Sequence, residues 1–495
     1  MKLPLLLVLS TLLTSSFARF VCYYGSWSVY RHGPAKFEIE NIDPTLCTHL
    51  VFAFVGLNRD GTVKIIDRWN DIGDEWKEGA YKKLQKLRAG NPKLKIMCGI
   101  GGWNEGSETY SHVVNNPQLR AVMVNSIYDF AVKYKFDGFD LDWEYPAQRG
   151  GKPSDREAFS QLIRELQEKF RLRGLILSAA VSADATKVET SYNCKDIAKN
   201  LEFINIMTYD LHGSWEKITG HHTALYPHPK DLPVDKHLNV DHAIRFWVEC
   251  TGAPSKLNIG LASYGRTFTL ADKNQHTVGS LVTGPGPAGS YVPENGFLGY
   301  NEVCKETRNG LWKIYDIPEQ KVKYGVKGNV WVGMDDTETI RLKVEYAKRL
   351  GLGGAMIWSI ETDDFRGECG KGKYPLLNTI KNALGSSNSP TNSTGTTFTP
   401  TPTYPSTQTP SPSNSPTYQP TQTTPVSLYF GLSRLRTAPT LTFIRIYFRT
   451  TISRPCVHTA ASSSNIRLSP IYSTVAHTML PELDLGPYNL NVLVI

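Results

Sequence analysis

The stretch FDGFDLDWEYP, at residues 136–146, combines an apolar strand pattern with a cluster of acidic residues. Residues 136–142 have the short and mostly apolar character of a strand that is buried on both faces of a parallel sheet. A helix is predicted to follow, because Ser154 and Glu157 have the spacing of a capping box. An apolar stripe then continues at helical spacing through Phe159, Leu162, Ile163, Leu166 and Phe170.

The same alternation of strand and helix extends over residues 19–385. Further apolar runs, rich in Val, Ile, Leu and Phe, are predicted as strands at residues 20–25, 49–54, 95–100, 175–181, 203–207, 257–262 and 355–360. A helix is predicted from about Asp336 to Leu350, ending at Gly351. Eight strands that alternate with helices predict an α/β fold of the (β/α)8 TIM-barrel type, and a doubly wound open sheet is the alternative.

The gap between the last two predicted strands is too long for a single helix. Residues of about 266–336 contain Gly- and Pro-rich turns and short alternating segments such as LWKIY at residues 311–315. Alternation of this kind is typical of half-buried strands, so we expect a small inserted α+β subdomain here.

The two ends of the chain differ in composition from this body. Residues 1–18 have a basic start, an apolar run and small residues after it, which predicts a signal peptide and a secreted, extracellular protein beginning near Arg19. Residues 386–426 are uncharged and rich in Ser, Thr and Pro, so we expect a disordered, O-glycosylated linker with an N-glycosylation sequon at Asn392. Residues 427–495 show no lasting period and are predicted to be an atypical, disordered tail.

Charge and apolar patterning exclude several classes of partner. The net charge of +8 is spread along the chain without a basic stripe and interleaved aromatics, so we expect no nucleic-acid partner. No stretch after the signal reaches the apolar length of a membrane span, so we expect no membrane partner. We expect the protein to be a monomer.

Cysteine and histidine usage bears on metals and disulfides. The eight Cys and the adjacent His221 and His222 lack zinc-like spacing, so we expect no metal and no cofactor. In an oxidising compartment some Cys should pair, but the sequence leaves the pairing open. Cys98 lies in a predicted strand and is expected to be a free buried thiol.

Asp140, Asp142 and Glu144 stand two residues apart, so their side chains share one face of the predicted strand. Because neighbouring carboxylates do not all ionise easily, at least one pKa should rise, and a carboxyl protonated near neutral pH can act as a general acid. Glu144 lies nearest the C-terminal end of the strand, where TIM-barrel enzymes hold their active sites, and is the candidate acid. A divalent-cation site and a structural charge network are the alternatives at this point.

The acidic stretch resembles the signature DxxDxDxE of family 18 glycoside hydrolases, the chitinase family. Five further segments are similar to motifs of that family: CYYGSW at residues 22–27, CGIGGW at 98–103, MTYDLHGSW at 207–215, YGR at 264–266 and GGAMIW at 353–358. The resemblance covers about residues 20–385. One departure is Gly99, which stands where the family usually has Ser or Ala.

The resemblance implies a secreted animal-type chitinase that hydrolyses β-1,4 bonds between N-acetylglucosamine units in chitin and chito-oligosaccharides. The hydrolysis would be retaining and assisted by the substrate's own acetamido group. Glu144 would be the general acid and base, and Asp142 would orient the acetamido group. Asp140 would share a proton with Asp142, and Tyr209 would hold the acetamido carbonyl.

The resemblance also implies which side chains contact sugars and which cysteines pair. The implied sugar-binding residues are Tyr23, Trp27, Phe54, Trp103, Met207, Asp210, Trp215, Tyr264, Arg266 and Trp358. The implied disulfides are Cys22–Cys47 and Cys304–Cys369. Taken without the resemblance, core packing is the alternative role for any one of these aromatics.

Two other functions fit the same barrel. One is a non-catalytic chitinase-like lectin, and the other is an endo-β-N-acetylglucosaminidase that acts on N-glycan cores. Non-catalytic relatives typically lose the acid. This sequence keeps Asp140, Asp142, Glu144, Tyr209 and Asp210, so we favour the chitinase.

Overall fold

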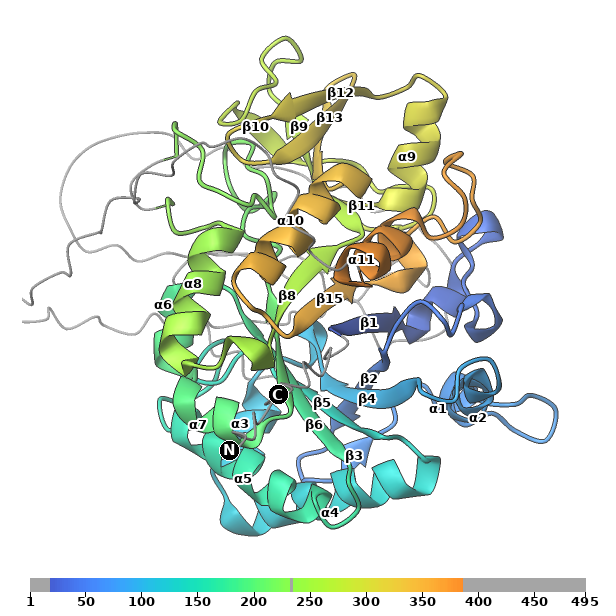
Figure 1. Cartoon of the computed structure of the whole chain (residues 1–495), viewed down its shortest axis with the longest axis vertical. Helices are drawn as coiled ribbons and strands as arrows, with labels where there is room; N and C mark the ends of the chain where they lie inside the picture. Colours follow the sequence, from blue (N-terminus) through green and yellow to red (C-terminus); the bar gives the residue numbers. More distant parts are fainter. Residues whose placement is uncertain (1–17, 232–234, 386–495) are drawn as a thin grey trace, which may run out of the picture. The chain divides into compact units, whose positions relative to one another are not determined.

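A closed ring of parallel strands forms the centre of residues 18–231 and 235–385, which the computed structural model describes (Figure 1). In ring order the strands are β1 (Arg19–Gly25), β2 (His49–Leu57), β4 (Lys95–Gly101), β5 (Gly138–Asp142), β6 (Ile176–Ser182), β7 (Phe203–Met207), β8 (Leu257–Ala262) and β15 (Gly354–Trp358). Strand β1 pairs in parallel with both β2 and β15, which closes the ring. The predicted TIM barrel is confirmed and the open sheet is excluded.

The eight strands lie where the apolar runs predicted them, with shifts of a few residues at the ends. Strand β5 begins at Gly138 rather than at Phe136. Strand β15 ends at Trp358, because Ile360–Thr362 form a short 3-10 helix, η7. The two-residue strand β3 (Val63–Lys64) extends the ring by antiparallel pairing with β2. Nearly all residues of the parallel strands are buried, as expected for strands covered on both faces.

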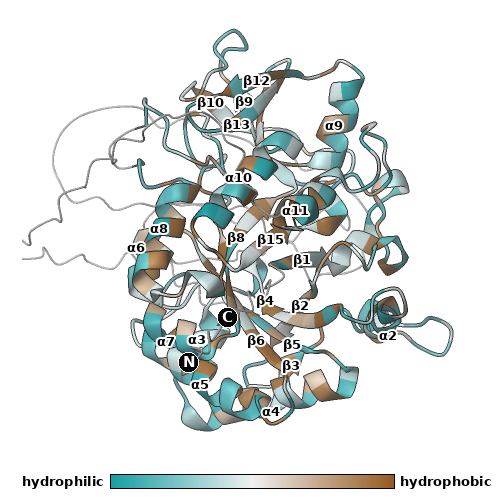
Figure 2. Cartoon of the chain, in the orientation of Figure 1, coloured by the Kyte–Doolittle hydropathy of each residue, from teal (hydrophilic) through white to brown (hydrophobic). Residues whose placement is uncertain are grey.

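Helices surround the ring, and Figure 2 shows hydrophilic residues on many of them around mostly hydrophobic strands. Their bounds are α1 (Arg68–Asp71), α2 (Ala80–Lys86), α3 (Glu108–Val114), α4 (Pro117–Tyr134), α5 (Asp155–Phe170), α6 (Ala185–Ser191), α7 (Cys194–Asn200), α8 (Val240–Thr251), α10 (Thr337–Arg349) and α11 (Pro375–Gly385). Helix α5 buries the whole predicted apolar stripe. Helix α10 ends as predicted, with Gly351 at a φ of 70° just beyond it.

The predicted capping box at the start of α5 is wrong. Ser154 has a φ of −66° and a ψ of −16°, and its side chain makes no capping hydrogen bond. A capping side chain needs an extended backbone at the N-cap, so helical angles turn the Ser154 hydroxyl away from the helix end. The Asp155 carboxylate instead accepts hydrogen bonds from the backbone N–H groups of Lys152 at 2.7 Å and Ala147 at 3.2 Å.

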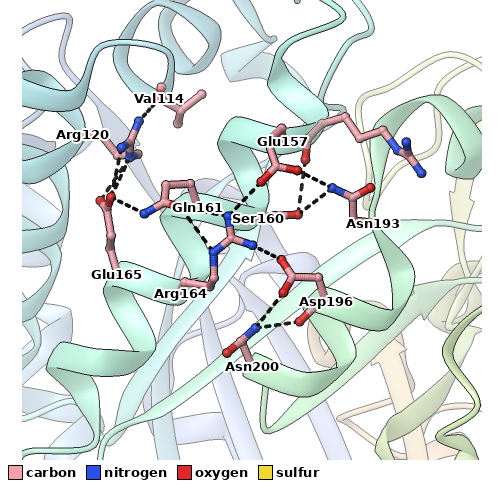
Figure 3. Close-up of polar contacts among 11 residues, drawn as sticks. Val114, Arg120, Glu157, Ser160, Gln161, Arg164, Glu165, Asn193, Asp196 and Asn200 are labelled. Atoms are coloured by element: carbon pink, nitrogen blue, oxygen red, sulfur yellow. Dashed lines mark hydrogen bonds and ion pairs between the residues drawn. The ribbon is translucent and has the colours of Figure 1, made fainter.

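A polar network ties the neighbouring helices α4, α5 and α7 together on the outside of the barrel (Figure 3). Arg120 of α4 forms a forked contact with the Glu165 carboxylate of α5, with nitrogen–oxygen distances of 2.9–3.1 Å. Arg164 of α5 donates to the Asp196 carboxylate of α7 at 2.5 Å. These contacts join three neighbouring helices on this side of the ring.

The expected α+β insertion lies between β8 and α10. Its antiparallel sheet contains β9 (Tyr264–Leu270), β10 (Val282–Pro285), β11 (Phe297–Gly299), β12 (Lys313–Ile317), β13 (Val322–Lys327) and β14 (Val330–Met334). One helix, α9 (Tyr300–Arg308), joins the sheet. The sheet starts at Tyr264, two residues before the predicted boundary, and carries its own apolar cluster around Phe268 and Trp331.

Three disulfides are present among the described residues. Two are the pairs that the resemblance implies, Cys22–Cys47 and Cys304–Cys369. The third, Cys194–Cys250, joins α7 to α8, and the sequence named no partner for either cysteine. Cys98 is buried and unpaired in the described chain, as expected.

Cys304 and Cys369 lie close to Asp364, in a spacing that could hold a metal ion. Their sulfurs are joined in a disulfide, so they are not available as thiolate ligands. The predicted signal peptide, linker, tail and glycosylation site at Asn392 lie outside the described residues. In the described part of the chain, we find no helix with the length and apolar character needed to cross a membrane.

Candidate active site

The acids of the central stretch lie at the C-terminal end of β5, and Asp140 is the deepest of them. The Tyr23 hydroxyl donates to Oδ2 of Asp140 at 2.6 Å. The Ser178 hydroxyl donates to Oδ1 at 2.5 Å, and Nδ2 of Asn205 donates to the same oxygen at 3.4 Å. Burial raises the pKa of Asp140 to about 6, although these three donors stabilise its carboxylate.

Asp142 is almost as deeply buried but has a poorer set of partners. Its Oδ1 has no hydrogen-bond partner among the described residues. Burial raises the pKa of Asp142 well above its ordinary value, and the charges of Glu144 and Asp140 raise it further. Of Asp140 and Asp142, Asp142 is therefore the better place for a proton, because the donors around Asp140 favour its anion.

Glu144 lies two residues beyond the end of β5 and is partly exposed. Burial raises the pKa of its carboxyl to about 7. A hydrogen bond with Tyr145 and the charge of Arg149 lower this pKa, whereas the charge of Asp210 raises it. A carboxyl with this pKa holds a proton in a substantial fraction of molecules at neutral pH, as a general acid must.

Asp210, three residues beyond β7, is held as an anion. Burial alone would raise its pKa, but hydrogen bonds from His222 and Arg266 and the charge of Arg266 hold it well below the usual range. Arg266 donates from Nε to Oδ1 at 2.7 Å and from Nη2 to Oδ2 at 2.8 Å. The Tyr264 hydroxyl donates to Oδ1 at 2.8 Å. The first strand of the insertion therefore supplies two side chains that fix Asp210.

Tyr209 and Met207 lie at the end of β7, inside the barrel. Both are packed in one buried apolar cluster with Tyr23, Tyr264 and Met356. The Tyr209 hydroxyl lies 3.5 Å from the sulfur of Met356, and its ring is edge-on to Tyr264 at 6.1 Å between ring centres. The structure thus brings four predicted site residues, Tyr23, Met207, Tyr209 and Tyr264, into one place, together with Met356 of β15, which was not predicted.

Aromatic rings extend this cluster toward solvent. Trp358, at the end of β15, lies 5.5 Å from Tyr23, 5.6 Å from Phe54 and 6.1 Å from Trp27, measured between ring centres. Trp27 is 44% exposed. A partly exposed set of flat rings beside buried carboxyls offers stacking surfaces for the apolar faces of sugar rings.

Trp103 and Trp215 were predicted to contact sugars too, and each is covered on one face by an arginine. Trp103 is 58% exposed, with the Arg149 guanidinium 3.5 Å from its ring centre. Trp215 is 59% exposed, with the Arg266 guanidinium at 5.6 Å. The other face of each ring is in contact with solvent.

Sequence reasoning missed several side chains that contact the acids. Ser178 and Asn205 lie in the predicted strands of β6 and β7, where a polar residue within an apolar run was the available signal. Arg149 and Tyr145 lie in the loop after β5, where no periodic pattern marks them. His222, for which the sequence indicated only that it lacks zinc-like spacing, lies 3.6 Å from Oδ1 of Asp210 through its Nδ1.

Gly99, the departure from the family motif, has a local explanation. A Cβ atom at this position would lie 2.9 Å from the Phe54 ring, closer than side-chain carbons pack. The missing side chain makes room for Phe54, which stacks on Trp358.

A family model described as glycosyl hydrolases family 18 matches residues 19–363, which span the barrel and the insertion. The chain belongs to family 18 of the glycosyl hydrolases. Within that family it is of the animal chitinase type, and it is a glycoside hydrolase.

This family 18 chain is similar to three known proteins. It is 40% identical over 393 residues to probable chitinase 2 of Drosophila melanogaster, covering 73% of this chain and 80% of the fly protein. The Group IV chitinase of Ostrinia furnacalis, solved in complex with allosamidin, is 41% identical with a TM-score of 0.72, covering 74% of this chain and 98% of that structure. Human YKL-39, described as a pseudo-chitinase with retained chitooligosaccharide binding, is 39% identical with a TM-score of 0.68, covering 74% and 100%.

Proposed function

We propose that this glycoside hydrolase is a chitinase that cleaves β-1,4 bonds between N-acetylglucosamine units, with Glu144 as the proton donor. The observation that carries the proposal is the state of the acids. Glu144 has a pKa raised to about 7, and it lies two residues from the buried Asp142, which is itself best occupied by a proton. This arrangement beside a set of partly exposed aromatic rings suits acid-catalysed cleavage of a bound sugar chain.

The proposed chemistry begins with proton transfer from the Glu144 carboxyl to the leaving glycosidic oxygen. The substrate's acetamido carbonyl oxygen attacks the anomeric carbon as the glycosidic bond breaks, which gives an oxazolinium-like intermediate. Opening of this intermediate by water then gives a product with retained anomeric configuration. Glu144, now an anion, takes a proton from water, and the resulting hydroxide opens the intermediate. The net reaction adds one water across one glycosidic bond.

Three neighbouring residues would position the acetamido group. Asp142 would pass the proton that the pair shares to Asp140 when substrate binds, and its carboxylate would then accept a hydrogen bond from the acetamido N–H and stabilise the positive intermediate. The Tyr209 hydroxyl would hold the carbonyl oxygen in attack geometry. Its long contact to the Met356 sulfur is a weak one, so this hydroxyl is free to turn to a stronger acceptor.

The proposed substrates are chitin and chito-oligosaccharides, bound along the aromatic rings of Trp358, Trp27, Phe54, Trp103 and Trp215. Structures of the relatives support this choice, because an Ostrinia furnacalis chitinase was solved with allosamidin and YKL-39 with chitooligosaccharides. We also propose that the protein is secreted, and the three disulfides among the described residues support an oxidising compartment.

A chitinase-like lectin is the second candidate, because a pseudo-chitinase relative is 39% identical to this chain. The lectin and the enzyme differ in whether the acid is present and protonated. Glu144 is present here with a raised pKa, and its neighbours Asp142 and Asp210 are in place, which favours the enzyme.

Hydrolysis of a fluorogenic chito-oligosaccharide by wild type and by Glu144→Gln, with and without EDTA, tests the proposal. Loss of the acid should lower kcat by roughly 10²–10⁴-fold without weakening oligosaccharide binding. Glu108→Gln is the matched control, because Glu108 is exposed and pairs only with the exposed Arg59 in the described contacts. Oligosaccharide binding by folded wild type without turnover would identify a lectin, and activity lost to EDTA would contradict the metal-free mechanism.

A further inference from the structure

A line of hydrogen bonds runs inside the barrel from Arg19, at the start of β1, to Asp140. Nε of Arg19 donates to Oδ1 of Asn258 at 3.3 Å. Nδ2 of Asn258 donates to Oδ1 of Asn205 at 2.9 Å. Nδ2 of Asn205 donates to the Tyr23 hydroxyl at 3.1 Å and to Oδ1 of Asp140 at 3.4 Å. We call Arg19, Asn258 and Asn205 the amide relay.

The strand register of the barrel builds this relay. Asn205 of β7 lies opposite Asn258 of β8, and Asn258 lies opposite Gly354 of β15, which in turn lies opposite Arg19. Both asparagine side chains are fully buried. A buried amide must satisfy its polar atoms inside the protein, so each asparagine depends on its neighbours in the relay.

The two ends of the relay set its direction. A guanidinium group only donates hydrogen bonds, and a carboxylate only accepts them. Because Arg19 donates to Asn258, the oxygen of the Asn258 amide faces Arg19 and its NH2 group faces Asn205. The Asn205 amide must then present its oxygen to Asn258 and its NH2 group to Asp140. The orientation of each amide therefore follows from Arg19 rather than from Asp140 alone.

Arg19 is itself held in place by its surroundings. Its Nη2 donates to the backbone oxygen of Ser255 at 2.5 Å, and its guanidinium lies 5.4 Å from the centre of the Phe203 ring. The charge of Glu202 also acts on Arg19. The donor end of the relay is thus anchored by contacts that lie outside the candidate active site.

We propose that Asn258 and Arg19 are positioning residues that orient the Asn205 amide toward Asp140 and so keep Asp140, rather than Asp142, as the ionised member of the pair. The inference deepens the proposed function and rests on it for its catalytic meaning. Neither Asn258 nor Arg19 contacts the acids, and both act through Asn205.

The groups that face Asp140 define what else could shift its titration. Asp142 lies on the same strand, Tyr23 reaches it from β1, and Tyr209 acts on it from beyond the end of β7. Strand β6 contributes the neutral Ser178 hydroxyl. Asn258→Leu leaves all of these groups and every charge unchanged, so a shifted titration of Asp140 in this variant would report on the relay.

The test follows the carboxyl carbon of Asp140 by NMR as a function of pH, in the full-length protein and without substrate. Asn258→Leu should raise the titration midpoint of Asp140 by roughly 0.5–1 unit, because the Asn205 amide loses its fixed direction. Asn258→Asp should raise it more. An aspartate side chain at this position would accept hydrogen bonds from both Arg19 and Asn205. The Asn205 NH2 group would then face the aspartate, and the Asn205 oxygen would face Asp140. Arg19→Met should shift the Asp140 midpoint in the same direction. The double variant Arg19→Met/Asn258→Leu should show no larger shift than Asn258→Leu alone.

A matched control separates orientation from loss of a buried amide. Asn239 is also buried, but its Oδ1 caps α8 by accepting from the backbone N–H of His242, and its Nδ2 donates to the backbone oxygen of Lys236. Asn239→Leu should cost stability and leave the Asp140 titration unchanged. Arg19 is partly exposed at the rim of the barrel, so Arg19→Lys, which keeps the charge but lacks the Nε–H that Asn258 accepts from, decides the question if the Asn258 variants do not fold.

The outcomes separate this inference from the proposed function. The relay is overturned if the titration midpoint of Asp140 equals the wild-type midpoint in Arg19→Lys and in every folded Asn258 variant. This conclusion does not depend on whether the enzyme is active. If the midpoints shift as expected but wild type hydrolyses no chito-oligosaccharide, the relay stands and the proposed function fails. In an active enzyme, the acidic limb of the kcat/KM profile should move to higher pH by the same amount as the midpoint.

Discussion

At the scale of single residues, the state of Glu144 depends on two opposite charges nearby. Asp210 raises the pKa of Glu144, and Arg149 lowers it. Asp210 is itself held as an anion by Arg266 and Tyr264, so its influence persists to low pH. The insertion thereby acts on the acid through a residue of the barrel.

Removing each charge should move the alkaline limb of activity in a predictable direction. Asp210→Asn removes an anion, which lowers the pKa of Glu144, so the acid loses its proton earlier and the alkaline limb of kcat/KM moves to lower pH. Arg149→Gln removes a cation, which raises that pKa, so the limb moves to higher pH. The kcat/KM profile of both variants on a soluble oligosaccharide measures this, and shifts of the same sign would contradict it.

Single residues also show where sequence reasoning stopped. The acids were found because three carboxyls at a spacing of two are unusual in an apolar strand. Ser178, Asn205 and Asn258 were missed because one polar residue in an apolar run does not reveal its partner on another strand. The third disulfide was missed for the same reason, since the pairing of Cys194 and Cys250 depends on how α7 packs against α8.

At the scale of elements, the strands were predictable because burial on both faces selects continuous apolar runs. Helix α5 was predictable from its stripe, but its first residues were not. Whether Ser154 caps the helix depends on backbone angles, and here the buried Asp155 takes over the contacts to the preceding loop. The boundaries of elements are therefore set by local contacts that composition does not contain.

The helix layer makes its own prediction about stability. Arg120→Ala removes a forked contact to Glu165 and a 2.7 Å hydrogen bond to the backbone oxygen of Val114, and the Arg120 side chain is only 12% exposed. We expect the free energy of unfolding to fall by about 1–2 kcal/mol.

Arg59→Ala is the control, because the Arg59–Glu108 pair is 62% and 80% exposed. It should cost less than about 0.5 kcal/mol. Urea unfolding of both variants measures the difference. Equal losses would show that the forked contact adds nothing beyond an ordinary surface ion pair.

At the scale of the whole molecule, the disulfides act on the unfolded chain as much as on the fold. Cys194–Cys250 closes a loop of 56 residues in sequence. Replacing both cysteines by alanine should lower the free energy of unfolding by roughly 2–4 kcal/mol, because the unfolded chain gains freedom. Denaturant unfolding of the oxidised double variant tests this, with Cys98→Ala as a cysteine control that breaks no disulfide. A double variant as stable as wild type would contradict it.

The architecture of the whole barrel was predictable from one repeated pattern, and the insertion from the break in that pattern. The way in which the barrel and the insertion together shape the site was not predictable. Tyr264 and Arg266 reach Asp210 only because β9 continues directly from β8 into the insertion, and this follows from tertiary packing.

The ring closes where its first strand, β1, pairs with its last strand, β15, and β1 also pairs with β2 on its other side. We call the β1–β15 pair the seam of the ring. During synthesis, the ribosome makes one side of this seam first and the other near the end of the barrel. Until residues 354–358 are made, β1 and β8 each lack the strand that closes the ring and present an unpaired edge. Until then Tyr23 also lacks its aromatic neighbour Trp358. The candidate site is therefore complete only once residues 354–358 have joined the ring.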